Sequence, residues 1–219
     1  ARLMIAMIKL TEGKLPEVVD CCLAVVRLDG QIYQRGGELV YVSDGQIYQV
    51  THDYLRVYLS SIARFERADR RGFVFPADCP KELAAAVLAQ RGFWGLPELR
   101  GVITAPVLTP AGRLIAKSGL DKETGLLLLL PPGYVCRIPE EPTEEDARRA
   151  LEMLLHPFMQ FPFVGPVDWG VMLAALLTAV VRPALPTAPG VLFDSPTAGT
   201  GKTLLTSCVA FFAGMSEPE

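Results

Sequence analysis

Residues 195–205 read SPTAGTGKTLL, and their composition suits a loop that grips phosphate groups. Gly199 and Gly201 permit backbone turns and a close approach that a Cβ atom would obstruct. Successive backbone N–H groups in TAGTGKT can then turn inward and form a concave nest for an anion. The ammonium of Lys202 and the hydroxyl of Thr203 follow where they would meet the β- and γ-phosphates and a Mg²⁺ ion. The pattern therefore predicts binding of a nucleoside triphosphate.

The predicted nucleotide-binding residues are consecutive, and they are Thr197, Ala198, Gly199, Thr200, Gly201, Lys202, Thr203 and Leu204. We expect ATP and Mg²⁺ as ligands, with Thr203 as the metal ligand. The full pattern G-x-x-x-x-G-K-[ST] has glycine where this chain has Pro196. Proline fixes its own φ and extends the residue before it, as in a chain that leaves a strand. The departure therefore affects the entry of the loop and spares the phosphate nest.

A loop of this kind needs a strand before it and a helix after it. The apolar run VLFD, residues 191–194, predicts the strand, and residues 202–214 have the pattern of a helix that ends at Gly214. A nucleotide-hydrolysing site also needs an acidic side chain at the end of a second strand. Segment 204–219 has no apolar run that ends in an acid. We therefore expect the chain to be the front part of a larger ATPase, without hydrolysis by residues 1–219 alone and without a catalytic residue of its own.

A second group of residues is basic. The segment RFERADRRGF follows a predicted helix, HDYLRVYLSSIARF, and continues its spacing. Its arginines recur at about helical intervals and are Arg64, Arg67, Arg70 and Arg71. Two interpretations remain open, a solvated helix end and a patch that contacts nucleic-acid phosphates.

Bulk composition limits the remaining possibilities. Half of the 219 residues are hydrophobic, so the chain can bury a core, and a formal net charge of −3 excludes a wholly basic DNA coat. Five cysteines without metal-ligand spacing, together with only two histidines, argue against zinc and favour a reducing, cytoplasmic compartment. The apolar run 169–181 is shorter than the ~20 residues that span a bilayer, which predicts a buried core helix and no membrane partner.

Local patterns supply the other elements. Pro16 and Gly30 bracket a predicted helix, and turns at Arg-Gly-Gly and Asp-Gly divide residues 29–51 into a three-stranded meander. Thr143 and Asp146 have the spacing of a helix-capping box. Further expected elements are a helix at 80–95, strands between 102 and 130, and a helix at 169–181 that Asp168 could cap and Pro183 ends.

The stretches APVLTPAGRLIAKSGLDKETGLLLL and FPFVGPVDWGVMLAALLTAVVRPALPTAPGVLFDSPTAGTGKTLL resemble ATPases and helicases of prophages, plasmids and integrative elements. These proteins belong with primase–helicases and with D5-like, superfamily 3-like helicases of the AAA+ class. The resemblance covers roughly residues 30–214 and is most specific in its last part. It implies an α+β N-terminal domain of helices and short antiparallel strands at 1–138. A linker and helix at 139–165 and the first strand, Walker A loop and helix of an AAA+ domain at 166–219 would follow.

The function that the resemblance implies is ATP-driven unwinding of DNA, or translocation on it, during replication of a mobile element. Single-stranded DNA would be the partner, and the full-length protein would assemble into a homo-oligomeric ring in which a neighbour's arginine completes each site. The acidic motif, the sensor and this arginine have no counterpart in the chain. The alternative is a nucleotide-switched regulator or defence ATPase whose N-terminal domain binds a protein partner.

Overall fold

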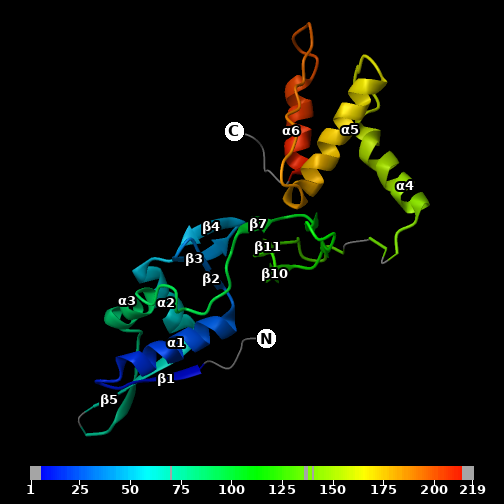
Figure 1. Cartoon of the computed structure of the whole chain (residues 1–219). Helices are drawn as coiled ribbons and strands as arrows, with labels where there is room; N and C mark the ends of the chain where they lie inside the picture. Colours follow the sequence, from blue (N-terminus) through cyan, green and yellow to red (C-terminus); the bar gives the residue numbers. More distant parts are fainter. Residues whose placement is uncertain (1–5, 70, 136–137, 140, 214–219) are drawn as a thin grey trace. The chain divides into compact units, whose positions relative to one another are not determined.

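The computed structural model describes residues 6–69, 71–135, 138–139 and 141–213, and it mixes α-helices with small sheets (Figure 1). Internal contacts divide the chain into two units. Unit 1 comprises Ala1–Val102 and Leu120–Leu127, and unit 2 comprises Ile103–Gly119 and Leu128–Glu219. A mixed α+β class agrees with the sequence-based expectation. The domain boundaries drawn from the sequence remain a prediction.

The helices of unit 1 begin at residues that the sequence marks. Helix α1 spans Leu15–Asp29, with proline in its first turn and Gly30 as a left-handed cap whose N–H bonds to Val26 O. Helix α2 spans His52–Ile62, and the side chain of Thr51 accepts a hydrogen bond from the N–H of Tyr54. Helix α3 spans Lys81–Leu88. The helices that the sequence predicts here are thus confirmed in position, although α2 and α3 are shorter than expected.

The predicted meander is also confirmed. Strands β2 (Ile32–Arg35), β3 (Glu38–Ser43) and β4 (Gln46–Gln49) pair antiparallel in that order. Tyr41 of β3 stacks on Tyr54 of α2 with ring centroids 3.9 Å apart. The meander is therefore fixed to the helical part of unit 1 by an aromatic contact.

The central sheet of unit 1 departs from the expected antiparallel arrangement. Strand β1 (Ala6–Leu10) pairs in parallel with β5 (Ala63–Ala68), and β6 (Val74–Ala77) pairs antiparallel with the other edge of β5. The prediction that a helix continues to Phe65 is wrong, because α2 ends at Ile62. Its physical reason is tertiary: the backbone of β5 finds its hydrogen-bonding partner in β1, which is distant in sequence.

The helices cover one face of this sheet. Ile8, Ala63 and Phe65 of the sheet belong to one buried cluster with side chains of α1, α2 and α3. Trp94 is 1% exposed in this cluster, and its indole Nε1 donates to Val87 O at 2.8 Å. The core therefore joins segments that are distant in sequence, from Ile8 of β1 to Leu96.

Short strands follow in the region that the sequence predicts as extended. Their bounds are β7 Gly101–Ile103, β8 Val107–Leu108, β9 Leu114–Ile115, β10 Gly119–Asp121 and β11 Leu126–Leu128. Strand β11 lies between β10 and β7, while β8 and β9 form an antiparallel pair. The leucine run therefore forms a strand over its first part only, and Leu128 is fully buried.

Unit 2 is mainly helical. Helix α4 spans Glu144–Leu155 and begins with the predicted capping box between Thr143 and Asp146. Helix α5 spans Pro166–Val181, where Asp168 accepts backbone hydrogen bonds that cap its first turn. Helix α6 spans Lys202–Phe212 and lies beside α5 (Figure 1).

Helix α5 buries only one side, which corrects the expectation of a fully buried core helix. Met172 and Leu176 pack with Phe158 and Leu205 in the unit 2 core, whereas Leu177 is 47% exposed. Among the described residues, no helix is long and apolar enough to cross a membrane.

Candidate functional site

The glycine-rich loop of unit 2 turns sharply into helix α6. Gly199 and Gly201 both have positive φ, 79° and 87°, a region that residues with a Cβ atom rarely adopt. Gly201 is the residue directly before α6, and its carbonyl accepts the N–H of Leu205 at 3.0 Å. The two glycines therefore shape the loop so that the backbone of residues 197–201 leads into the N-terminus of a helix, where free N–H groups favour an anion.

Lys202 lies over this loop. Its Nζ donates a hydrogen bond to the carbonyl oxygen of Ser195 at 3.3 Å, so the ammonium spans the loop from its end to its beginning. The Ser195 hydroxyl in turn donates to Thr197 O at 3.2 Å. A single backbone acceptor thus holds the ammonium at the loop, and an anionic ligand atom can replace that acceptor with a charge-assisted bond.

A cavity of about 540 Å³ lies against the loop. Its polar lining comes from Asp168, Asp194, Ser195, Thr200 and Lys202, and its apolar lining includes Phe161, Phe163, Val171, Met172, Leu192 and Leu205. The hydroxyl of Thr200 is buried and has no hydrogen-bond partner among the described residues. Because a buried polar atom without a partner is costly, this hydroxyl favours a polar ligand in the cavity.

The other predicted loop residues are open to solvent. Thr197, Ala198, Gly199, Thr203 and Leu204 are exposed. The Thr203 side chain, in the first turn of α6, forms no hydrogen bond with any residue that the structure describes, so its hydroxyl is free to bind a cation. In the described ranges, no group of three or more His, Cys, Asp or Glu residues could hold a metal ion. A Mg²⁺ ion here would therefore depend on Thr203 and on the phosphates themselves.

The strand predicted at 191–194 is not formed. These residues have irregular backbone and pair with no strand in the described part of the chain. Phe193 nevertheless packs against the unit 2 core. The apolar pattern thus predicts burial only for Phe193, because Val191 and Leu192 are exposed, and a strand also requires a neighbouring strand to bond its N–H and C=O groups. The strand–loop–helix unit is therefore present only as loop and helix.

Two acidic residues of this site escaped the sequence analysis as site residues. Asp194 directly precedes the loop, and its Oδ1 accepts the N–H of Ser195 at 2.7 Å. Asp168 was expected only as a helix cap, but it also lines the cavity. The signal that could have identified Asp194 is its place between the apolar run and the loop.

The predicted basic patch lies in unit 1, on strand β5 and the turn that follows it. Arg64, Arg67 and Arg71 are exposed, and Arg70 lies outside the described residues. Because side chains alternate along a strand, Arg64 and Arg67 project from opposite faces of β5. The prediction that these arginines share one face of a helix is therefore wrong. Their contact with nucleic acid stays a prediction.

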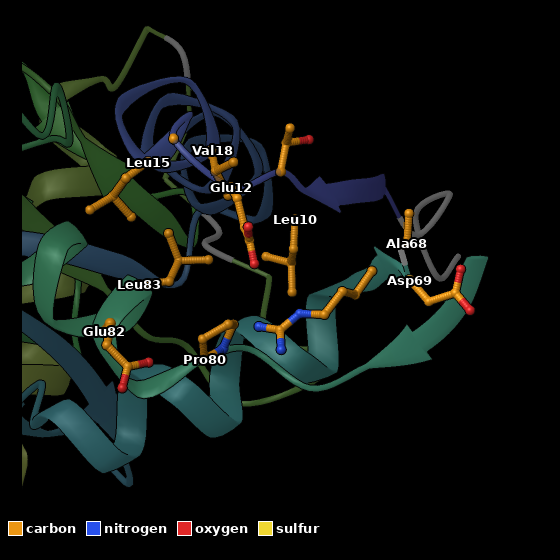
Figure 2. Close-up of a pocket in the computed structure, with 12 residues that line it drawn as sticks. Leu10, Glu12, Leu15, Val18, Ala68, Asp69, Pro80, Glu82 and Leu83 are labelled. Atoms are coloured by element: carbon orange, nitrogen blue, oxygen red, sulfur yellow. The ribbon is translucent and has the colours of Figure 1, made fainter. Parts of the chain in front are cut away.

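A second cavity, of about 610 Å³, lies where the parallel strands β1 and β5 end (Figure 2). Crevices outside the carboxyl ends of parallel strands are frequent ligand sites. Its charged lining comprises Glu12, Arg67, Asp69 and Glu82. Three carboxylates and one guanidinium therefore make up its charged lining. The sequence did not indicate this cavity, because it depends on the β1–β5 pairing.

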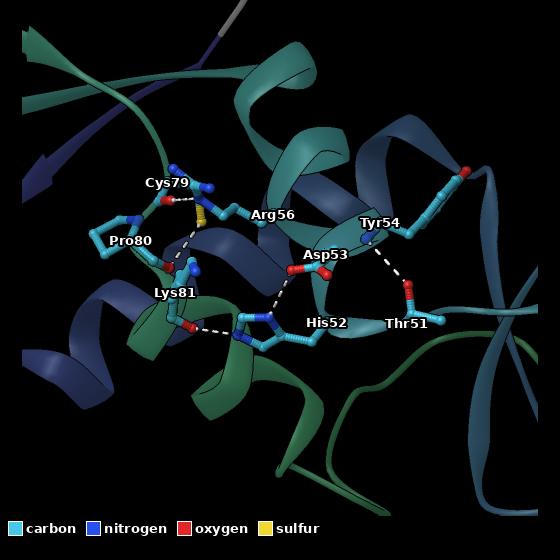
Figure 3. Close-up of polar contacts among 8 residues, drawn as sticks. All are labelled: Thr51, His52, Asp53, Tyr54, Arg56, Cys79, Pro80 and Lys81. Carbon is cyan, nitrogen blue, oxygen red and sulfur yellow. Dashed lines mark hydrogen bonds and ion pairs between the residues drawn. The ribbon is translucent and has the colours of Figure 1, made fainter.

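Figure 3 shows the polar contacts that join α2 to the start of α3. His52 Nε2 donates to the carbonyl oxygen of Lys81 at 2.7 Å, and Arg56 Nε donates to Cys79 O at 3.0 Å. Since a carbonyl oxygen only accepts, Nε2 of His52 carries a proton and has no lone pair for a metal or a substrate. This cluster is therefore structural.

Comparison with known proteins adds no relative to these observations. No protein-family model matches the chain, and neither the search of curated proteins nor the search of solved structures found a match.

Proposed function

We propose that the loop of residues 197–204 binds the phosphates of ATP together with Mg²⁺, and that the protein uses this nucleotide to act on DNA. The observation that carries the proposal is the position of Lys202, whose ammonium lies across the loop and donates to Ser195 O. Two glycines with positive φ and the start of α6 supply backbone N–H groups around the same point.

The cavity beside the loop supports a nucleotide as the ligand. Its volume lies within the range of small-molecule sites, roughly 300 to 1,000 Å³. Its walls combine an apolar part, formed by side chains such as Phe161 and Met172, with the polar groups Thr200 and Lys202. A ligand with an apolar base and charged phosphates matches this division. When the ion is bound, Mg²⁺ would neutralise phosphate charge, and Thr203 would be the residue that holds it.

DNA as the object of this activity rests on the sequence resemblance and on the exposed arginines of unit 1. Arg64, Arg67 and Arg71 form no ion pair with any residue in the described ranges. Free guanidinium groups are available for phosphate contacts. The specific function we propose is that of an ATP-dependent helicase or translocase in the replication of a mobile element, with ring assembly as part of it.

A second candidate is a nucleotide-switched regulator whose unit 1 binds a protein. The observation in its favour is the exposure of large apolar side chains on helices of unit 1, with Leu28 71% and Val57 69% exposed. DNA binding by the intact protein at low salt discriminates the two candidates, since the regulator requires none.

Titration of the protein with a fluorescent ATP analogue and Mg²⁺ tests the nucleotide site. Lys202→Ala removes the one cation that lines the cavity among the described residues, so we expect affinity to fall at least ~10-fold, by ~1.5–3 kcal/mol for a charged hydrogen bond. Lys117→Ala is the matched control, because Lys117 is an exposed lysine of the same unit away from the loop. Equal affinities for the two variants would remove the nucleotide assignment. Hydrolysis by residues 1–219 should stay negligible.

A further inference from the structure

The hairpin formed by β5 and β6 exposes aromatic side chains beside its arginines. Phe73 is 71% exposed, Val74 57% and Phe75 44%. A single exposed apolar residue is ordinary, but Phe73 and Phe75 are two residues apart and therefore share a face of the hairpin, whereas Val74 lies on the opposite face. Two of the three present a flat aromatic face.

The turn of this hairpin is held by its own acid. Asp69 Oδ1 accepts the N–H of Arg71 at 2.8 Å and that of Phe73 at 2.9 Å. The Asp69 N–H donates to Phe73 O at 2.9 Å. The carboxylate that the sequence places among the arginines is therefore bonded to backbone and holds the turn. These bonds fix the backbone of the turn at Arg71 and Phe73.

Strand register brings one arginine and one aromatic side chain together. Arg67 lies directly opposite Phe75, and Phe65 lies opposite Ala77 on the same face. Phe65 is 2% exposed beneath the helices, whereas Arg67 and Phe75 are in solvent. One face of the hairpin is thus core at its base and an open basic–aromatic surface at its end.

We propose that this surface, formed by Arg67, Arg71, Phe73 and Phe75, binds single-stranded nucleic acid. Bases would stack on the two phenylalanine rings, and phosphates would contact the two guanidinium groups, neither of which is ion-paired within the described part of the chain. The two unpaired guanidinium groups favour an anionic occupant, because Asp69, the carboxylate of the same turn, is already bonded to the backbone N–H groups of Arg71 and Phe73. Addition of a peptide strand to the edge of β6 is opposed by Pro76, which has no N–H to donate.

The inference deepens the proposed action on DNA and rests on it for the class of partner, but it is independent of the nucleotide loop. It also distinguishes among the arginines that the sequence grouped. Arg64 lies on the opposite face of β5 from Arg67, nearer the base of the hairpin. Arg64→Ala should therefore weaken binding less than Arg67→Ala.

Fluorescence anisotropy with a labelled oligothymidylate tests the stacking. In the double variant Phe73→Leu/Phe75→Leu, apolar bulk remains but the aromatic faces are lost, so affinity should fall at least ~5-fold and up to ~150-fold for one stacked base. Phe73→Tyr/Phe75→Tyr should retain binding. Phe93→Leu is the matched control, because Phe93 is a 79% exposed phenylalanine of the same unit outside the hairpin.

The salt dependence of binding tests the ionic part. Each single-strand phosphate contact contributes about 0.7 to the slope of log K against log salt, so Arg67→Ala/Arg71→Ala should flatten the slope by about 1.4. Arg35→Ala, which removes an exposed arginine of strand β2, should leave it unchanged. Thermal unfolding of every variant checks that the fold is retained, as expected for exposed positions.

Three results would overturn the inference. They are no binding of oligothymidylate by the unaltered protein at low salt, equal binding by the leucine and tyrosine variants, and an unchanged slope after loss of both arginines. Equal binding by the leucine variant would mean that the bases do not stack on Phe73 and Phe75. ATP-analogue binding measured on the same proteins separates the proposals. If it persists while DNA binding is absent, the hairpin inference alone fails, and if it is absent while DNA binding persists, the nucleotide site alone fails.

Discussion

Substitution of the glycine before α6 tests whether the loop has the geometry that nucleotide binding requires. Gly201 has φ 87°, where an L-residue costs about 1–2 kcal/mol. An added Cβ atom would also lie 3.0 Å from Cε1 of Phe161, so the ring would have to move by a few tenths of an ångström. Because Phe161 is only partly buried, we assign this contact the low end of overpacking costs, about 1 kcal/mol. The expected cost of Gly201→Ala is therefore about 2–3 kcal/mol in total.

Gly199 provides the matched control. Its φ of 79° carries the same backbone strain, but no atom lies within 4 Å of the position of an added Cβ. A loop that is competent only part of the time binds more weakly by that fraction. We expect affinity for the ATP analogue with Mg²⁺ to fall about 5- to 30-fold for Gly199→Ala and about 30- to 150-fold for Gly201→Ala.

A second change isolates the contact with the aromatic ring. Phe161→Leu combined with Gly201→Ala should bring affinity back to the level of Gly199→Ala, once the effect of Phe161→Leu alone is subtracted in a double-mutant cycle. Equal losses for the two glycine variants, or a cycle without coupling, would show that the loop does not hold this conformation when nucleotide binds. The reasoning from its geometry would then be refuted.

Two further predictions follow from shifted pKa values. Hydrogen bonds from the Thr143 side chain and backbone and from Arg149 lower the pKa of Asp146 from 3.8 to about 2. The cap of α4 should therefore be intact above pH 4 and lost as the pH falls towards 2. NMR titration of the Thr143 amide should report this loss, and a midpoint near pH 4 would contradict the prediction. Burial raises the pKa of Cys22 to about 12 and that of Cys79 to about 11. Iodoacetamide at pH 8 should therefore alkylate the exposed Cys21 before Cys22 and Cys79. Mass spectrometry that found Cys22 modified as fast as Cys21 would contradict the burial of Cys22.

Features that depend on neighbouring residues could be predicted from the sequence. Gly30 caps α1, Thr143 and Asp146 cap α4, and the Asp-Gly and Gly-Gly turns set the meander, because each of these structures forms within a few residues. The glycine-rich loop of residues 197–201 is equally local. Gly199 and Gly201 have the conformations that their types permit, and Lys202 is carried to the loop by the helix that it begins.

Pairings between distant segments could not be predicted in this way. Residues 63–68 continue a helical spacing, yet they form a strand because β1 supplies hydrogen bonds that no local pattern reports. That pairing places Arg64 and Arg67 on opposite faces, sets Arg67 against Phe75 and creates the cavity where β1 and β5 end. The converse holds at 191–194, where an apolar run without a neighbouring strand remains irregular. The sequence by itself determined the helix caps, the turns and the residue types of the loop. Only the tertiary structure decided which strands exist and which side chains share a face, because the N–H and C=O groups of a strand form their hydrogen bonds with a neighbouring strand.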